Sequence, residues 1–141
     1  MYVGSGFSRT MAIVAAFVAM VLVTGAFAQK RPYNLVMKDV GTTFDALRQN
    51  LDGKNAAAAS DAERLAQLFQ ETEDFWTPFR TKDAIEAAKG ARELAAVVAT
   101  AVRAKDIEKA KTAASGLGRF CTSCHNAHRE QMPDKSYRIR P

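Results

Sequence analysis

The sequence predicts an all-α domain built as an up-down-up-down bundle of four helices. Four separate stretches repeat apolar residues at steps of three and four, which is the spacing of one face of an α-helix. Glycine occurs eight times and proline four times in 141 residues, so few positions interrupt a helix. No stretch shows the sustained alternation of apolar and polar residues that is typical of a half-buried strand. Because the links between the helical stretches are short, successive helices should lie antiparallel.

Local signals set the expected ends of these helices. Ser60 and Glu63 have the S-x-x-E spacing of a capping box, which predicts the start of the second helix. Asp106 is expected to cap the fourth helix. Gly53 should follow the first helix in the left-handed conformation, and Pro133 should end the fourth and leave a loose tail. The four helices are expected over residues 34–51, 60–76, 82–104 and 106–132.

Residues 1–28 differ in composition from the remainder of the chain. Arg9 is the only charged residue before Lys30, and the stretch that follows Arg9 is almost entirely apolar. Ala26-Phe27-Ala28 has the small-x-small form of a cleavage site. We therefore expect a signal peptide that is cleaved after Ala28 and exports the chain to the periplasm. The alternative is a retained membrane anchor, because residues 10–29 are uncharged and long enough to span a bilayer.

Residues 29–141 are expected to form a single domain, since a chain of this length suits one hydrophobic core. The whole sequence has 20 basic and 15 acidic side chains, a formal net charge of +5. These charges alternate in sign along the helical stretches, as on an ordinary solvated surface. Only Lys135, Arg138 and Arg140 form a basic cluster, which suits either a frayed terminus or steering of an acidic partner. The pattern gives no reason to expect nucleic-acid binding.

The one strongly specific motif is Cys121-Thr122-Ser123-Cys124-His125, near the end of the chain. Its C-x-x-C-H spacing is typical of c-type haem attachment, in which two thiols add to the haem vinyl groups and the histidine coordinates the iron. On a helix, positions i, i+3 and i+4 share one face, so all three side chains can face one flat ring. We therefore expect one covalently bound haem c. Export agrees with this expectation, because the cytochrome c maturation machinery attaches such haem outside the bacterial cytoplasm.

Two other chemistries use the same residue types. A C-x-x-C pair can be a dithiol redox motif, but that motif usually follows a strand, and no strand pattern precedes Cys121. Cys121, Cys124, His125 and His128 are also the residue types that bind zinc. A zinc finger separates its two ligand pairs by a loop, however, and here the pairs adjoin. Haem attachment is therefore favoured over both alternatives.

The residue on the opposite side of the iron from His125 decides the function. A methionine there gives a closed haem for electron transfer, whereas an open or apolar side leaves an iron that binds small gases. Met132 and His128 lie beyond His125 on the same helix and cannot readily reach the opposite side. Met37 lies on the apolar stripe of the first helix, which a bundle can bring across the haem. Met37 is therefore either the sixth ligand or an ordinary core methionine.

An exported helical chain with a C-terminal C-x-x-C-H motif resembles the class II cytochromes c, the cytochrome c′ family. Residues 118–129 follow the pattern G-x-x-C-x-x-C-H-x-x-H-R, which is similar to the family's G-x-x-C-x-x-C-H-x-x-[FY]-R. His128 stands where the family usually has an aromatic residue, so packing at the haem edge should differ. Residues 35–41, around Met37, are similar to the corresponding segment of the low-spin branch of the family.

The resemblance implies a four-helix bundle with one haem attached through Cys121 and Cys124. It implies that His125 and Met37 coordinate the iron and that Arg129 lies close to a haem propionate. The implied function is periplasmic electron transfer by a carrier that is not an enzyme, with unidentified redox proteins as partners. Family members often dimerise through their first two helices, so a homodimer is compatible with the resemblance. The alternative is the high-spin branch, whose five-coordinate haem binds gases such as nitric oxide.

Overall fold

The computed structural model describes residues 30–141. The signal peptide expected over residues 1–28 lies outside the described residues, as does Gln29. Within the described part of the chain, no helix is both long enough and apolar enough to cross a membrane. Residues Arg31–Pro141 form one compact unit. Its elements are α2 (Tyr33–Asp52), α3 (Ala57–Trp76), the 3₁₀ turn η1 (Thr77–Phe79), α4 (Lys82–Arg103), α5 (Ile107–His128), β1 (Arg129–Gln131) and β2 (Tyr137–Ile139).

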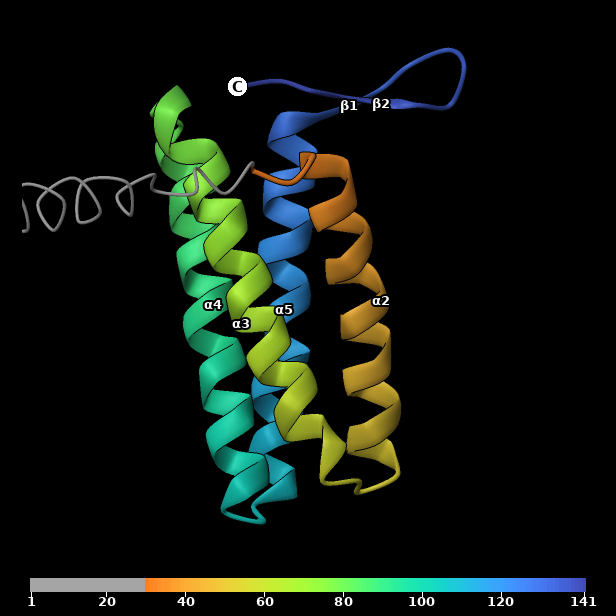
Figure 1. The fold of residues 1–141 in the computed structure, drawn as a ribbon, viewed down its shortest axis with the longest axis vertical. Helices are drawn as coiled ribbons and strands as arrows, with labels where there is room; N and C mark the ends of the chain where they lie inside the picture. The colour runs from red at the N-terminus through yellow and green to blue at the C-terminus, as the bar shows by residue number, and fades with distance from the viewer. Residues whose placement is uncertain (1–29) are drawn as a thin grey trace, which may run out of the picture. The chain divides into compact units, whose positions relative to one another are not determined.

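Successive helices run in opposite directions, so the prediction of an all-α up-down-up-down bundle is confirmed (Figure 1). α3 packs along both α2 and α4, and α4 packs along α5, whereas α2 touches α5 only sparsely. Because α2 and α5 are antiparallel, the first turns of α2 and the last turns of α5 lie at the same end of the bundle (Figure 1). The C-x-x-C-H motif belongs to this end.

The core consists of buried leucines and small residues. Leu47, Leu65, Leu68 and Leu117 are each 0 % exposed, and they come from three different helices. Burying one such side chain contributes about 1.5–3 kcal/mol. α4 contributes mainly alanines, whose small side chains allow the neighbouring helices to pack closely against it. The buried residues of α4 are Ala84, Ala88, Ala91, Ala95, Val98, Ala99, Ala101 and Val102.

Hydrogen bonds explain where two of the helices begin. Asp106 caps α5 as predicted, because its carboxylate accepts a 3.1 Å hydrogen bond from the backbone N–H of Lys109. The prediction that α3 starts at Ser60 is wrong, since the helix already begins at Ala57. Asn55 Oδ1 accepts a 3.0 Å bond from the Ala57 N–H, and the alanines that follow are good helix formers. The helix therefore forms before the chain reaches the capping-box sequence.

The end of α2 also differs from the prediction. Gly53 has a φ of −73°, and the left-handed residue is Lys54, with a φ of 52°. The Lys54 N–H donates to the Leu51 carbonyl at 3.2 Å, and the Asn55 N–H donates to the Asn50 carbonyl at 2.8 Å. This is the Schellman pattern of a helix C-terminus, placed one residue later than the glycine predicts.

The C-terminal tail is folded, which corrects the prediction of a loose tail after Pro133. α5 ends at His128, and β1 then pairs antiparallel with β2. In the connecting turn, Lys135 has a φ of 67°, and the hydroxyl and N–H of Ser136 donate to Asp134 at 2.6 and 3.0 Å. An aspartate that accepts from the backbone two residues later is a common way to form a turn. The hairpin lies at the end of the bundle where α2 begins (Figure 1).

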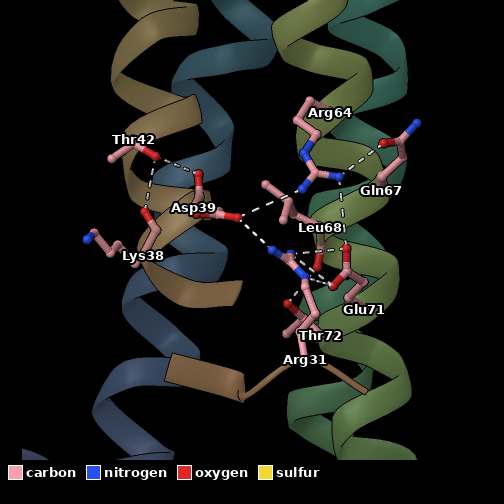
Figure 2. A network of polar contacts seen from close by, with 9 residues as sticks. All are labelled: Arg31, Lys38, Asp39, Thr42, Arg64, Gln67, Leu68, Glu71 and Thr72. Atoms are coloured by element: carbon pink, nitrogen blue, oxygen red, sulfur yellow. Dashed lines mark hydrogen bonds and ion pairs between the residues drawn. The ribbon is translucent and has the colours of Figure 1, made fainter. Parts of the chain in front are cut away.

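A network of exposed ion pairs joins α2 to α3 (Figure 2). Arg31, just before α2, donates to Asp39 at 2.7 Å and to Glu71 at 3.0 Å, so one guanidinium bridges the two helices. Arg64 lies 3.8 Å from the carboxylate of Asp39 and 4.0 Å from that of Glu71. The hydrogen bond from Arg31 lowers the pKa of Asp39. Exposed pairs contribute little stability singly, but this network fixes the start of α2 against α3.

Leu65→Ala tests the packing of the core. Leu65 is 0 % exposed on α3, so its truncation leaves a cavity and should lower the free energy of unfolding by about 2–5 kcal/mol. Leu35→Ala is the matched control, because Leu35 is 46 % exposed on α2 and its truncation should cost less than about 0.5 kcal/mol. Denaturant unfolding of both full-length variants measures the two values. Equal losses would contradict the packing described.

Candidate functional site

The C-x-x-C-H motif occupies the last turns of α5, which is uninterrupted through His128. Cys121, Cys124 and His125 are each half-buried, and all three line one small cavity of about 40 Å³. Both cysteines are free thiols, and burial raises the pKa of each. Burial, together with the positive charge of Arg129, lowers the pKa of His125. Its imidazole is therefore neutral at neutral pH, which is the state that coordinates a metal.

Met37 reaches the same cavity from α2. It is half-buried, and it lines the small cavity together with Cys121, Cys124 and His125. A larger cavity of about 350 Å³ shares Met37, Cys124 and His125 with the first and adds Arg129. The structure thus brings all five predicted site residues to one end of the bundle. The antiparallel arrangement of α2 and α5 is the cause, since it sets the first turns of one helix beside the last turns of the other.

Aromatic side chains form much of the wall of the larger cavity. Trp76 is 1 % exposed, and its Nε1–H donates a 3.0 Å hydrogen bond to the hydroxyl of Tyr33. Tyr33 also stacks on Phe75, with ring centroids 3.8 Å apart. Burial raises the pKa of Tyr33 to about 12, so the phenol is neutral. Walls of this kind suit a large, flat and mostly apolar ligand.

His128 ties the C-terminal hairpin to the bundle. Its Nδ1 lies 2.8 Å from the carbonyl oxygen of Arg140, and its Nε2 lies 2.9 Å from the carboxylate of Asp83 on α4. Both of these partners, a carbonyl oxygen and a carboxylate, are hydrogen-bond acceptors, and each faces one ring nitrogen of His128. The bond from His128 lowers the pKa of Asp83. The His128 ring packs on Trp76, with centroids 5.0 Å apart, and so forms part of the cavity wall.

The hairpin itself supplies another part of this wall. Tyr137 and Ile139 of β2 line the larger cavity beside Arg129. The guanidinium carbon of Arg129 lies 4.1 Å from the centroid of the Tyr137 ring, a cation–π contact. The Arg140 N–H donates to the His128 carbonyl at 2.8 Å, which holds β2 against the end of α5. The folded tail is therefore a structural component of the site.

The side chains at these cavities fit a covalently bound haem. Two thiols and an imidazole lie on one helix, and a thioether reaches the same cavity from the facing helix. A zinc site needs several thiols, imidazoles or carboxylates gathered around one point. Among residues 30–141 no three such groups are gathered in this way. A haem brings its own equatorial nitrogen ligands, so it needs only axial ligands and attachment points from the protein.

Comparison with known proteins adds no family assignment. No family model, no characterised protein and no solved structure matches the chain significantly. The fold and the site define a four-helix all-α domain with a C-x-x-C-H motif and a largely apolar cavity at one end. The resemblance to the class II cytochromes c rests on that motif and on the bundle.

Sequence reasoning missed two contributors to the site, and each had a signal. Tyr33 lies one helical turn before Met37, so the helical spacing that singles out Met37 puts Tyr33 on the same face. The hairpin was signalled by Pro133-Asp134, a pair that favours turns, followed by the strand-forming residues Tyr137 and Ile139. Both signals are short, and they become informative only once the packing partner is known.

Asp83→Asn should loosen the hairpin, because it removes the carboxylate that accepts from His128. The expected result is faster hydrogen exchange of the Arg140 amide, which is bonded to the His128 carbonyl. Glu86→Gln is the matched control, since Glu86 is an exposed acid one turn further along α4. Exchange that is equally slow in both variants would contradict the anchoring role of His128.

The same contact predicts a dependence on pH. The pKa of Asp83 is lowered from its ordinary value of 3.8, so its carboxylate stabilises the folded state above that value. Protection of the Arg140 amide should therefore persist at mildly acidic pH and be lost as the pH falls through the lowered pKa. In the Asp83→Asn variant this acid-dependent loss should be absent.

Proposed function

We propose that this chain is a monohaem c-type cytochrome that carries electrons, similar to the low-spin class II cytochromes c. The observation that supports the proposal most is that the C-x-x-C-H motif of α5 and Met37 of α2 line the same cavity. The motif alone is compatible with other thiol chemistry. An imidazole and a thioether that reach one cavity from facing helices are the ligand pair of a six-coordinate cytochrome haem.

Each site residue has a distinct role in this proposal. Cys121 and Cys124 hold the haem through thioether bonds. His125 offers a neutral ring nitrogen to the iron, and burial favours that neutral state. Met37 of α2 would offer its thioether sulfur to the iron, and Arg129 would provide a positive charge for a propionate. When bound, the haem supplies the one-electron ferric and ferrous couple that the carrier uses.

The protein's own contribution is to hold two ligands still and to keep water away. His125 and Met37 belong to helices that are packed through buried side chains such as Leu47 and Leu117, so neither moves freely. The aromatic wall around Trp76 surrounds the site with apolar surface, and a methionine ligand raises the reduction potential. If His125 and Met37 both hold the iron, the domain would act as a carrier, and no residue would have a catalytic role.

The same proposal includes location and partners. Residues 1–28 direct export and are removed after Ala28, and the cytochrome c maturation machinery then attaches the haem in the periplasm. Other redox proteins of that compartment donate and accept the electron.

Covalent attachment is the first prediction of this proposal. The full-length chain, expressed with a cytochrome c maturation machinery, should yield a protein heavier than the processed polypeptide by one haem. Replacing both Cys121 and Cys124 by alanine should abolish that added mass under denaturing conditions. Ser123→Ala is the control, because Ser123 lies between the cysteines with its exposed hydroxyl bonded to a backbone carbonyl, and it should load normally. A wild-type protein without the added mass would contradict the proposal and favour zinc or dithiol chemistry.

Met37→Ala tests the sixth ligand. Removing the thioether should convert a low-spin, six-coordinate spectrum to a high-spin, five-coordinate one and allow fast carbon monoxide binding to the reduced protein. Met132→Ala is the control, since Met132 lies in the hairpin turn and lines neither cavity. A Met37→Ala spectrum that stays low-spin would show that another group is the ligand. Ready carbon monoxide binding by the wild type would instead favour a gas-binding protein.

A further inference from the structure

Two polar groups of the larger cavity have no acceptor within residues 30–141. The Tyr33 hydroxyl accepts the 3.0 Å hydrogen bond from Trp76, because an indole N–H can only donate. A phenol can also donate one hydrogen bond, and among the described residues no acceptor receives that proton. The guanidinium of Arg129 lies over the Tyr137 ring, and no carboxylate of residues 30–141 forms an ion pair with it.

The Tyr33 hydroxyl stays protonated and is held in one orientation. Burial raises the pKa of Tyr33 to about 12, so the hydroxyl remains a donor throughout the physiological pH range. The ring cannot turn away easily, because it stacks on Phe75 at 3.8 Å and its oxygen is held by Trp76. Tyr33 is half-buried, and a hydroxyl partly shielded from water is stabilised by an acceptor close by. A ligand in the cavity is the natural source of the acceptor.

Tyr33 and Arg129 lie at the rim of the site. Tyr33 is one turn before Met37 on α2, and Arg129 is about one turn beyond His125 at the end of α5. Because the two helices are antiparallel, Tyr33 and Arg129 are both displaced from Met37 and His125 toward the same end of the bundle (Figure 1). All four residues line the larger cavity. A ligand held between Met37 and His125 therefore has one edge beside Tyr33 and Arg129.

We infer that Tyr33, together with Arg129, binds the carboxylate edge of the ligand that this cavity holds. An O–H donor and a guanidinium without an ion-pair partner among residues 30–141 line the same cavity and together favour an anion, and a carboxylate can accept from both. The aromatic walls select a flat, apolar body for the rest of the ligand. This inference rests on the proposed function, in which that edge is the haem propionates, and it makes Tyr33 a positioning residue.

The structure of the haem-loaded, full-length protein tests the inference directly. Tyr33 Oη should lie about 2.5–3.0 Å from a propionate oxygen, with the bond from Trp76 retained. A Tyr33 hydroxyl that donates to water or to the protein backbone would overturn the inference. The haem covalently attached in that same structure would leave the proposed function standing, so the two failures are distinguishable.

Tyr33→Phe tests the consequence in solution, since it keeps the ring and removes only the donor. The midpoint potential of a haem protein varies with pH where a propionate ionises. Loss of a donor that stabilises the ionised carboxylate should move that inflection to higher pH by about one unit, a tenfold change in proton affinity.

Thr42→Val is the matched control for this measurement. It removes a hydroxyl from the same helix, but that hydroxyl bonds to the carbonyls of Lys38 and Asp39, so the inflection should not move. A Tyr33→Phe inflection that matches the wild type, in protein of normal haem mass, would overturn the role of Tyr33. Wild-type protein without covalent haem would overturn the proposed function instead.

Discussion

The site depends on the antiparallel arrangement of α2 and α5, which brings the start of one helix and the end of the other to the same end of the bundle (Figure 1). α2 is held mainly by α3, through its buried face and the ion pairs of Arg31, and it touches α5 only sparsely. A largely apolar cavity therefore remains where Met37 and His125 face the same space. A chain this short buries a limited core. A ligand that fills this cavity would add apolar contacts between α2 and α5, so loading and stability should be coupled.

The fold was predictable where the sequence of a single helix contains the residues that determine it. Apolar residues at helical spacing can be buried together only in a bundle, and Asp106 marks the start of α5 through a bond to a residue three positions later. The C-terminal hairpin was not predicted, because its two strands are three residues each, too short for an alternating pattern to be visible. Its turn also places Lys135, rather than a glycine, in the left-handed conformation.

The site residues also fall into two groups: those placed by a single helix and those placed by packing between helices. Cys121, Cys124 and His125 were predictable because a single helix fixes their relative positions. For Met37 the sequence left two roles open, iron ligand or core methionine, because nothing in it says which residue of α2 faces α5. Tyr33 was missed because its hydrogen bond joins residues 43 positions apart and depends on how α2 lies against α3. Long-range contacts of this kind are set by packing, and local spacing does not report them.

The central claim is that one haem lies between the ligands of α5 and α2. The visible spectrum of the purified holoprotein, recorded in the oxidised and reduced states, tests it most directly. The proposal predicts a low-spin spectrum whose oxidised form has the weak long-wavelength band of charge transfer from methionine to ferric iron. A high-spin, five-coordinate spectrum would contradict it, return Met37 to the core and favour gas binding. A spectrum without haem bands would contradict the haem site itself.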